Sequence, residues 1–267
     1  MSNLDQLDEA IGRYVRPETF PLAIRMLKDG QSAPERAKHP LRDLKVQITT
    51  CMGYTMSRRY GWVISMSRED ISCPLSKTVY GFEEEVDYFK RGCTCAGMYT
   101  SSEEAGARTE ASVAKFGWHE YSSIVCAPLA RTDFDPHVVL VYGNSAQVML
   151  LVAAFLYDSG GRISSSFAAR IDCSDSVIET MKSGRPQVIL PCYGDRVFGQ
   201  TQDYEMAFSF PAAECTRIID GLKGTYKGGV RYPIPTFLRY QPSYPESYTK
   251  LERIWGERRE PEPPAKR

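Results

Sequence analysis

The chain has 267 residues, which is enough to bury a full hydrophobic core as one large domain or two small ones. Hydrophobic residues make up 42% of it and charged residues 25%, ordinary values for a globular protein. Thirty-three basic residues balance thirty-three acidic ones. Without a net charge to attract polyanions, the composition argues against a protein that binds nucleic acid or anionic lipid.

Nothing near the N-terminus resembles a targeting segment. The first residues, MSNLDQLDEAIG, are acidic and amphipathic and lack the apolar run of a signal peptide. The longest apolar run, residues 148–157, is about half a membrane span. We therefore expect a cytoplasmic protein, in which the eight cysteines are free thiols or metal ligands and not disulfides.

Taken in chain order, the hydrophobic patterns predict helices and strands that alternate along most of the chain. Helices are expected at 4–14, 52–60, 82–90, 101–115, 146–157, 176–183 and 212–222, and strands at 21–27, 62–66, 121–129, 137–142, 187–190 and 205–210. This order predicts the α/β class, with α+β as the alternative.

One pattern occurs twice, in residues 45–82 and 163–199. Each copy contains an extended run, a cysteine, about three turns of helix, a glycine, a second extended run, a second cysteine and a further glycine. The copies align Cys51 with Cys173, Gly61 with Gly184, Cys73 with Cys192, and Gly81 with Gly199. We expect one body over residues 1–229, made of two pseudo-equivalent halves at about 1–129 and 130–229.

Beyond Val230 the composition changes, because prolines and tyrosines interleave. Such a segment cannot form a central strand or one continuous helix. We expect residues 230–255 to form an extended arm with a short helix at 248–255, packed on another surface and most simply on a second copy in a homodimer. Residues 256–267 are expected to be a mobile tail.

The four repeated cysteines are the candidate metal ligands. Cys51 and Cys173 enter helix N-termini, where the helix dipole favours a thiolate. Cys73 and Cys192 follow the second strand of each copy. If the copies pack about a pseudo-two-fold axis, all four thiols meet at one site, and four cysteines suit zinc or an iron–sulfur cluster.

The spacing of the cysteines favours the cluster over zinc. A structural zinc ion is usually held by closely spaced pairs. These pairs have 21 and 18 intervening residues, so their ligands would come from separate parts of a preformed fold. A [4Fe–4S] cluster is the first expectation, with zinc or no metal as alternatives. Small buried hydrophobic thiols are the simplest other use of such residues.

Two further features bear on a site. Gly194, Asp195 and Arg196 form a turn directly after Cys192, a loop that can approach a ligand closely, with Arg196 as a fork-shaped donor to an anion. The alternative is an Asp–Arg surface pair. Cys93 and Cys95 form a C-x-C loop whose spacing is a weak metal or redox signal, and the sequence does not assign it a role.

The pattern resembles domain of unknown function family 169, a family of bacterial and archaeal cytoplasmic proteins, from about Leu4 to Leu222. The matching stretches are PLAIRML, Cys51, Ser72-Cys73-Pro74, Ala127-Pro128-Leu129, VVLVYG with Gln147, Cys173, and Pro191-Cys192 with Gly194-Asp195-Arg196. The resemblance supports the fold and the four cysteines and implies no reaction. Cys93, Cys95, Cys126, Cys215 and the arm beyond Val230 lie outside these stretches.

Three functions remain open at this point. The first is an iron–sulfur protein, either redox or accessory, or an enzyme whose cluster has an open iron for a small anionic substrate. The second is a binding module for a small molecule or partner protein, with thiols in its core. The third is a structural zinc protein. The expected partners are a small molecule or a redox partner protein and a second copy of the chain.

Overall fold

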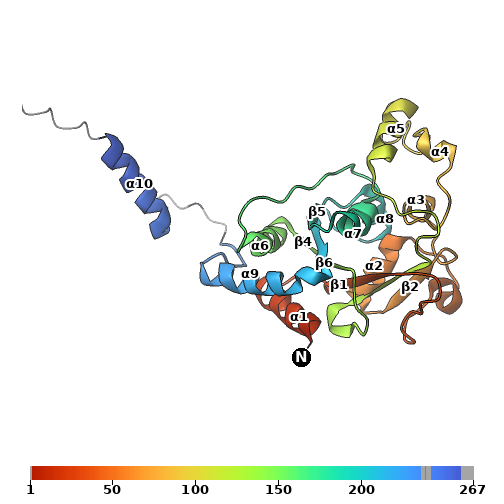
Figure 1. Ribbon diagram of the computed structural model, residues 1–267, viewed down its shortest axis with the longest axis horizontal. Helices are drawn as coiled ribbons and strands as arrows, with labels where there is room; N and C mark the ends of the chain where they lie inside the picture. The colour runs from red at the N-terminus through yellow and green to blue at the C-terminus, as the bar shows by residue number, and fades with distance from the viewer. Residues whose placement is uncertain (1, 236–237, 239–241, 260–267) are drawn as a thin grey trace, which may run out of the picture. The chain divides into compact units, whose positions relative to one another are not determined.

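The computed structural model describes residues 2–235, 238 and 242–259, of which 257–259 are described as helical backbone alone. The chain divides into two compact units, Met1–Tyr232 and Pro233–Arg267. The first unit contains every strand found in the described residues (Figure 1).

A six-stranded sheet forms the centre of the first unit. Its strands lie in the order β2-β3-β1-β4-β6-β5, and all the neighbouring strands pair antiparallel. The strands are β1 (Leu22–Leu27), β2 (Ile64–Ser67), β3 (Ser123–Pro128), β4 (Val138–Asn144), β5 (Gln187–Ile189) and β6 (Glu205–Pro211). The expected mixture of helices and sheet is confirmed.

The hydrogen-bonded register of β2-β3-β1 corresponds to that of β5-β6-β4. Leu22 of β1 pairs with Pro128, and Val138 of β4 pairs with Pro211. In the next strand of each set, Cys126 lies between Ile24 and Ile64, and Ser209 between Leu140 and Gln187. A short 3₁₀ turn follows each proline, Leu129–Arg131 in one set and Ala212–Glu214 in the other. This pairing supports the expected internal repeat, which stays a prediction.

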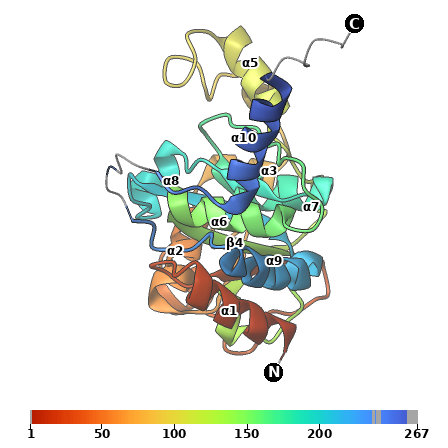
Figure 2. The same cartoon turned by 90° about the vertical axis from the view of Figure 1, so that its left-hand side faces the viewer.

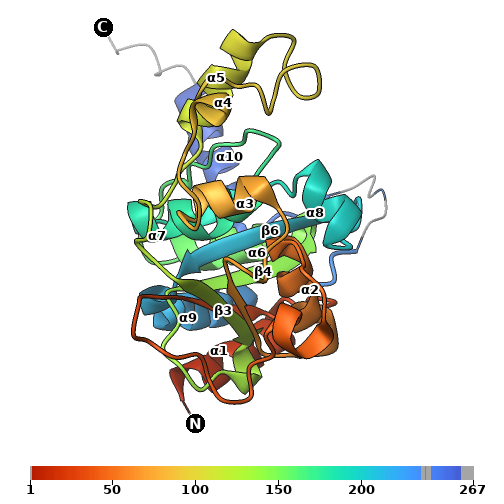
Figure 3. The ribbon, with the colours of Figure 1, turned by 90° about the vertical axis from the view of Figure 1, so that its right-hand side faces the viewer.

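Helices cover both faces of the sheet. On one face lie α1 (Asn3–Tyr14), α6 (Ser145–Leu156) and α9 (Cys215–Lys227), which bury Leu7, Leu151 and Ile218 in one apolar cluster (Figure 2). On the other face lie α2 (Thr50–Tyr60), α3 (Pro74–Val79) and a helix that begins as a π-helix at Ser174–Glu179 and continues as α7 (Thr180–Ser183) (Figure 3).

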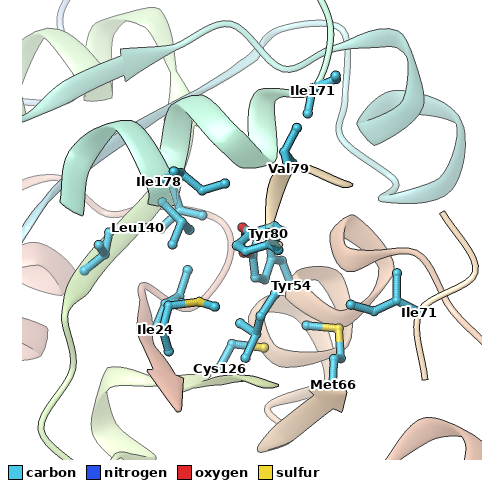
Figure 4. Close-up of a cluster of buried hydrophobic side chains, with 14 of the residues drawn as sticks. Ile24, Tyr54, Met66, Ile71, Val79, Tyr80, Cys126, Leu140, Ile171 and Ile178 are labelled. Carbon is cyan, nitrogen blue, oxygen red and sulfur yellow. The ribbon is translucent and has the colours of Figure 1, made fainter. Parts of the chain in front are cut away.

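The core beneath α2 and α7 contains two buried tyrosines. The hydroxyls of Tyr54 and Tyr80 lie 2.8 Å apart, and Tyr80 also donates to the Cys173 carbonyl at 2.9 Å. Figure 4 shows both rings surrounded by aliphatic side chains that include Ile24 and Ile178. A buried hydroxyl needs such partners, so these bonds link α2, α3 and the segment before α7 through the core.

Local side-chain contacts and glycines define several of the helix ends. Thr49 caps α2 by accepting from the Met52 N–H at 3.2 Å. Asn144 caps α6 in a reciprocal pair with Gln147. Gly61 and Gly184 end their helices with φ of 72° and 64°, a conformation that favours glycine.

Residues between β2 and β3 form a projecting lobe that holds α4 (Asp87–Lys90) and α5 (Glu103–Ser112) (Figure 1). The helix expected at 82–90 is wrong over its first half, because only Asp87–Lys90 is helical. Phe82 instead turns inward and is buried in the core. Burial of this aromatic ring outweighs the helical preference of the three glutamates that follow it, which differs little per residue from that of other side chains.

The second unit contains the helix α10 (Glu246–Arg259), longer than the segment expected at 248–255. Tyr248, Leu251 and Trp255 on it are exposed. Residues 260–267 of the expected tail, and 236–237 and 239–241 of the expected arm, lie outside the described residues. Along the described chain, no helix is both long enough and apolar enough to span a membrane.

Candidate functional site

Four cysteines line one cavity of about 310 Å³ on the α2–α7 face of the sheet. They are the four that the repeat singles out: Cys51, Cys73, Cys173 and Cys192. Each is partly buried, and none forms a disulfide. The rest of the lining is Thr49, Thr50, Leu75, Ser76, Thr94, Met98, Tyr99, Arg170, Ile171, Asp172, Tyr193, Gly194, Asp195, Val197 and Phe198.

Each cysteine lies where a helix begins. Cys51 is in the first turn of α2, and Cys173 immediately precedes the π-helical segment. Cys73 is the N-cap of α3, followed by Pro74, and Cys192 is the N-cap of α8 (Tyr193–Phe198). Residues 193–198 were expected to be a loop, so that prediction is wrong. The helix between Pro191 and Gly199 has six residues, which is too short to produce a periodic pattern in the sequence.

Cys51 lies at the junction of the two cysteine units. Its Sγ is 2.9 Å from the Thr49 hydroxyl and 3.9 Å from the carbonyl oxygen of Gly194. Gly194 comes from α8, which contacts α2. A thiol in residues 45–82 thus lies against the backbone of residues 163–199.

The segment before Cys173 is strained. Ala169 and Ile171 have φ of 57° and 53°, in the left-handed region, which is rare for a residue with a β-branched side chain such as Ile171. Backbone strain of this kind persists where the surroundings determine the conformation, and it is frequent at functional sites. Here it lies beside Arg170 and Asp172, both of which reach the cavity.

Two buried carboxyls stand among the thiols. Asp172 and Asp195 are 5% and 1% exposed. Burial raises the pKa of Asp172, and burial together with the charge of Asp172 raises the pKa of Asp195 well above its usual value. Because each ionised carboxyl opposes ionisation of the other, the pair retains a proton at pH values where an ordinary aspartate has none.

Three of the thiols, Cys51, Cys173 and Cys192, are held protonated in this environment, contrary to the expectation that helix N-termini stabilise thiolates at Cys51 and Cys173. Burial and the charge of Asp195 raise the pKa of Cys51. Burial and the charge of Asp172 raise the pKa of Cys173. The same two causes raise the pKa of Cys192 to about 12. Desolvation and neighbouring carboxyls therefore outweigh the helix dipole, whose effect is confined to the first turn.

A buried ion pair joins the projecting lobe to the cavity wall. Arg170 Nη2 lies 3.0 Å from Glu110 Oε1, and both side chains are at most 1% exposed. The guanidinium also donates to Cys95 Sγ and lies over the Tyr99 ring, 5.0 Å from its centroid. Glu110 lies on the helix expected at 101–115, and it is buried because Arg170, from a distant segment, supplies its counter-charge.

A second buried ion pair lies behind Asp195. Arg58 Nη1 donates to Glu205 Oε1 at 2.7 Å, and Arg58 Nη2 donates to the Thr201 hydroxyl at 3.1 Å. Thr201 in turn donates to Asp195 Oδ2 at 2.9 Å, and Tyr142 donates to the same oxygen at 3.2 Å. The Asp195 carboxyl is thus held by a chain of hydrogen bonds anchored on Arg58.

Only two of the three residues of the predicted ligand-binding turn lie at the cavity. Gly194 and Asp195 line the cavity, whereas Arg196 is not among the lining residues. Its Nη1 donates to the Gln202 carbonyl at 2.6 Å. Of the remaining cysteines, Cys95 packs against Arg170 and Glu110, Cys126 and Cys215 are buried in the core clusters, and Cys93 is partly buried in the lobe.

The thiols share the cavity without meeting at one point. Among the described residues, no three His, Cys, Asp or Glu side chains are placed to hold a single metal ion. Four cysteines and two carboxyls nonetheless converge from four segments of the chain. The arrangement offers soft sulfur donors around an otherwise apolar space.

The sequence analysis missed three residues of this site. Asp172 directly precedes Cys173 in the sequence, and this position was a usable signal. Arg170 and Tyr99 carry no local signal, because their roles depend on the lobe folding against the segment before Cys173.

Comparison with known proteins identifies relatives without a described activity. The model of family DUF169, described as "Uncharacterised ArCR", matches residues 10–221, which include the whole lining of the cavity. A protein of Methanocaldococcus jannaschii named "Uncharacterized protein MJ0308" is 29% identical over 122 residues, 45% of this chain. That match spans about half of the relative, 52% of its length. No solved structure matches the chain.

Proposed function

The chain belongs to the DUF169 family, and we propose that it binds an iron–sulfur cluster in its four-cysteine cavity. The observation that supports this is the convergence of Cys51, Cys73, Cys173 and Cys192 on one space, from four segments far apart in sequence. Packing alone gives little reason for four thiols to line the same cavity, since a buried cysteine behaves as a small hydrophobe wherever it lies.

A cluster suits this arrangement better than a single zinc ion does. The sulfurs around one zinc lie at about 2.3 Å from it and so close to one another. No described group has that placement. A cluster is several atoms across, so the cysteines that hold it stand farther apart.

Cluster binding must change the protonation of the site. The thiolate is the form that binds iron, and burial holds the pKa of Cys192 at about 12 in the metal-free cavity. Assembly therefore releases protons and becomes more favourable as the pH rises. The N-terminus of α2, next to Cys51, favours the negative charge once it forms.

Two roles are proposed for the cluster: electron transfer to a partner protein, or catalysis at an open iron. The variant with a small anionic substrate also stays a prediction. The arginine expected to bind the anion, Arg196, is engaged by the Gln202 carbonyl, and Arg170 is paired with Glu110.

Anaerobic purification tests the proposal directly. We expect a brown protein with iron and acid-labile sulfide, before or after reconstitution with ferrous iron and sulfide. Serine at Cys51, Cys73, Cys173 or Cys192 should each lower the iron content severalfold. Cys215→Ser is the matched control, because Cys215 is buried on the opposite face of the sheet, and it should leave the iron unchanged.

Other outcomes would decide against the cluster. Colourless protein with one bound zinc would favour the structural zinc hypothesis. Protein that takes up no metal after reconstitution would favour a thiol-lined binding cavity. Equal iron loss in the Cys215→Ser control would mean that the effect is one of folding.

A further inference from the structure

The mouth of the cavity is ringed by large apolar side chains that face solvent. Met98 and Tyr99 come from the lobe, and Tyr193, Val197 and Phe198 come from α8. All five line the cavity and are between 36% and 67% exposed. Exposed apolar residues gathered at a concave site mark a place where apolar surface is covered by a ligand.

The polar groups inside the cavity select against an anion. Among the described lining residues, Arg170 is the only basic side chain, and Glu110 neutralises it. Asp172 and Asp195 are both acidic, and a negative ligand beside them would be repelled.

One of these carboxyls has an unused hydrogen-bonding atom. Asp195 Oδ2 accepts from Tyr142 and Thr201, whereas Asp195 Oδ1 is buried and has no hydrogen-bond partner in the described part of the chain. A buried polar atom without a partner is uncommon in a folded protein, and a ligand is one of the groups that can satisfy it.

We infer that the cavity takes a small molecule with an apolar body and a single O–H or N–H end that donates to Asp172 and Asp195. The apolar body lies against the ring of Met98, Tyr193 and Phe198 at the mouth. The donor end is either neutral or a cation. This inference rests on the proposed function only in assigning the ligand to the same cavity.

Four probes that share one benzyl body test the inference: toluene, benzyl alcohol, benzylammonium and phenylacetate. Their binding to the full-length chain is measured by calorimetry near neutral pH, as purified and after removal of iron. We expect benzyl alcohol, benzylammonium or both to bind at least about tenfold more tightly than toluene and phenylacetate, as the loss of a buried hydrogen-bonding partner costs about that much or more. The two donor probes distinguish a neutral ligand from a cation.

Variants locate the binding. Asp172→Leu keeps the branched shape of the side chain and removes the acceptor, and it should abolish the preference for the donor probes. Asp175→Leu, the same change at a neighbour that does not line the cavity, should leave it unchanged. Phe198→Ser should weaken all bound probes severalfold, whereas Trp118→Ser, at a similarly exposed aromatic outside the cavity, should not.

The inference fails if toluene or phenylacetate binds as tightly as the donor probes, if none of the four binds, or if folded Asp172→Leu keeps the preference. Should Asp172→Leu not fold, the rank order of the probes on the unchanged chain decides. If the chain binds iron but does not prefer the donor probes, this inference is wrong and the cluster proposal stands. If the chain prefers the donor probes but takes up no iron, the cluster proposal is wrong and this inference stands.

Discussion

The two helices that carry Cys51 and Cys173 hold equivalent places in the sheet pairing and differ in charge. Each ends at a left-handed glycine, and four residues earlier each carries a hydroxyl that meets the second strand of its set. Ser57 contacts Cys126 Sγ at 3.1 Å, and Thr180 contacts Ser209 Oγ at 2.7 Å. These shared contacts position both helices against the sheet.

The two helices differ in length and in charge. Cys51 precedes its glycine by ten residues and Cys173 by eleven, and the longer helix contains the π-helical segment Ser174–Glu179. Such a segment accommodates an extra residue, and it is frequent at functional sites. The first helix carries the buried cation Arg58, whereas the second begins with the acids Asp172 and Asp175. Of these three charged residues, only Asp172 lines the cavity, and Arg58 lies behind it.

Removing the buried cation should have the largest effect. Arg58→Met leaves Glu205 without its main partner and interrupts the chain of bonds to Asp195. We expect a loss of about 3–5 kcal/mol in the free energy of unfolding, measured by urea titration. Arg59→Met, at a more exposed arginine on the same carboxylate, should cost less. Equal losses in the two variants would mean that the buried Arg58 stabilises the fold no more than the partly exposed Arg59 does.

The acid of the second helix should act in the opposite direction. Burial raises the pKa of Asp175 from 3.8 to about 7. Between these values the folded chain binds more protons than the unfolded chain, so stability falls as the pH rises from about 4 to about 7. Asp175→Asn should stabilise the metal-free protein by about 1–4 kcal/mol above pH 7 and by nothing near pH 4. A gain that is independent of pH would contradict this assignment.

The terminal glycines offer a matched pair of changes. Alanine at either position must adopt a left-handed conformation, which costs about 1–2 kcal/mol. A Cβ at Gly184 meets nothing within 4 Å, whereas one at Gly61 would lie 2.8 Å from Arg131 Nη1. Thermal unfolding should therefore show a larger loss for Gly61→Ala than for Gly184→Ala. Equal losses would mean that the Arg131 side chain moves away freely, and a larger loss for Gly184→Ala would contradict the prediction.

The smallest effects should come from the shared hydroxyls. Ser57→Ala and Thr180→Val each remove one buried contact between helix and strand, worth about 0.5–1.5 kcal/mol. Similar losses, additive in the double variant, would agree with equivalent and independent roles in the two sets of strands. A loss confined to one of them would argue against the internal repeat.

Several local elements followed from short stretches of sequence. The helix at Asn3–Tyr14, the capped start of α6 and the glycine ends of both cysteine helices depend on neighbouring residues only. Periodicity, caps and left-handed glycines act within a turn or two, so they can be read without knowing the fold. The choice of four cysteines among eight came from the repeat in the same way, and all four line one cavity.

Tertiary structure decided what those residues meet. Glu110 is buried because Arg170 reaches it, and Arg196, expected at the site, binds the carbonyl of Gln202 instead. The thiols expected to ionise stay protonated, since burial and the carboxyls of Asp172 and Asp195 outweigh the helix dipole. Charge pairing and desolvation depend on distances between segments remote in sequence. The sequence alone therefore determined the longer helices and which cysteines to examine, whereas only the packed fold decided the short helix after Cys192 and the charges around the cavity.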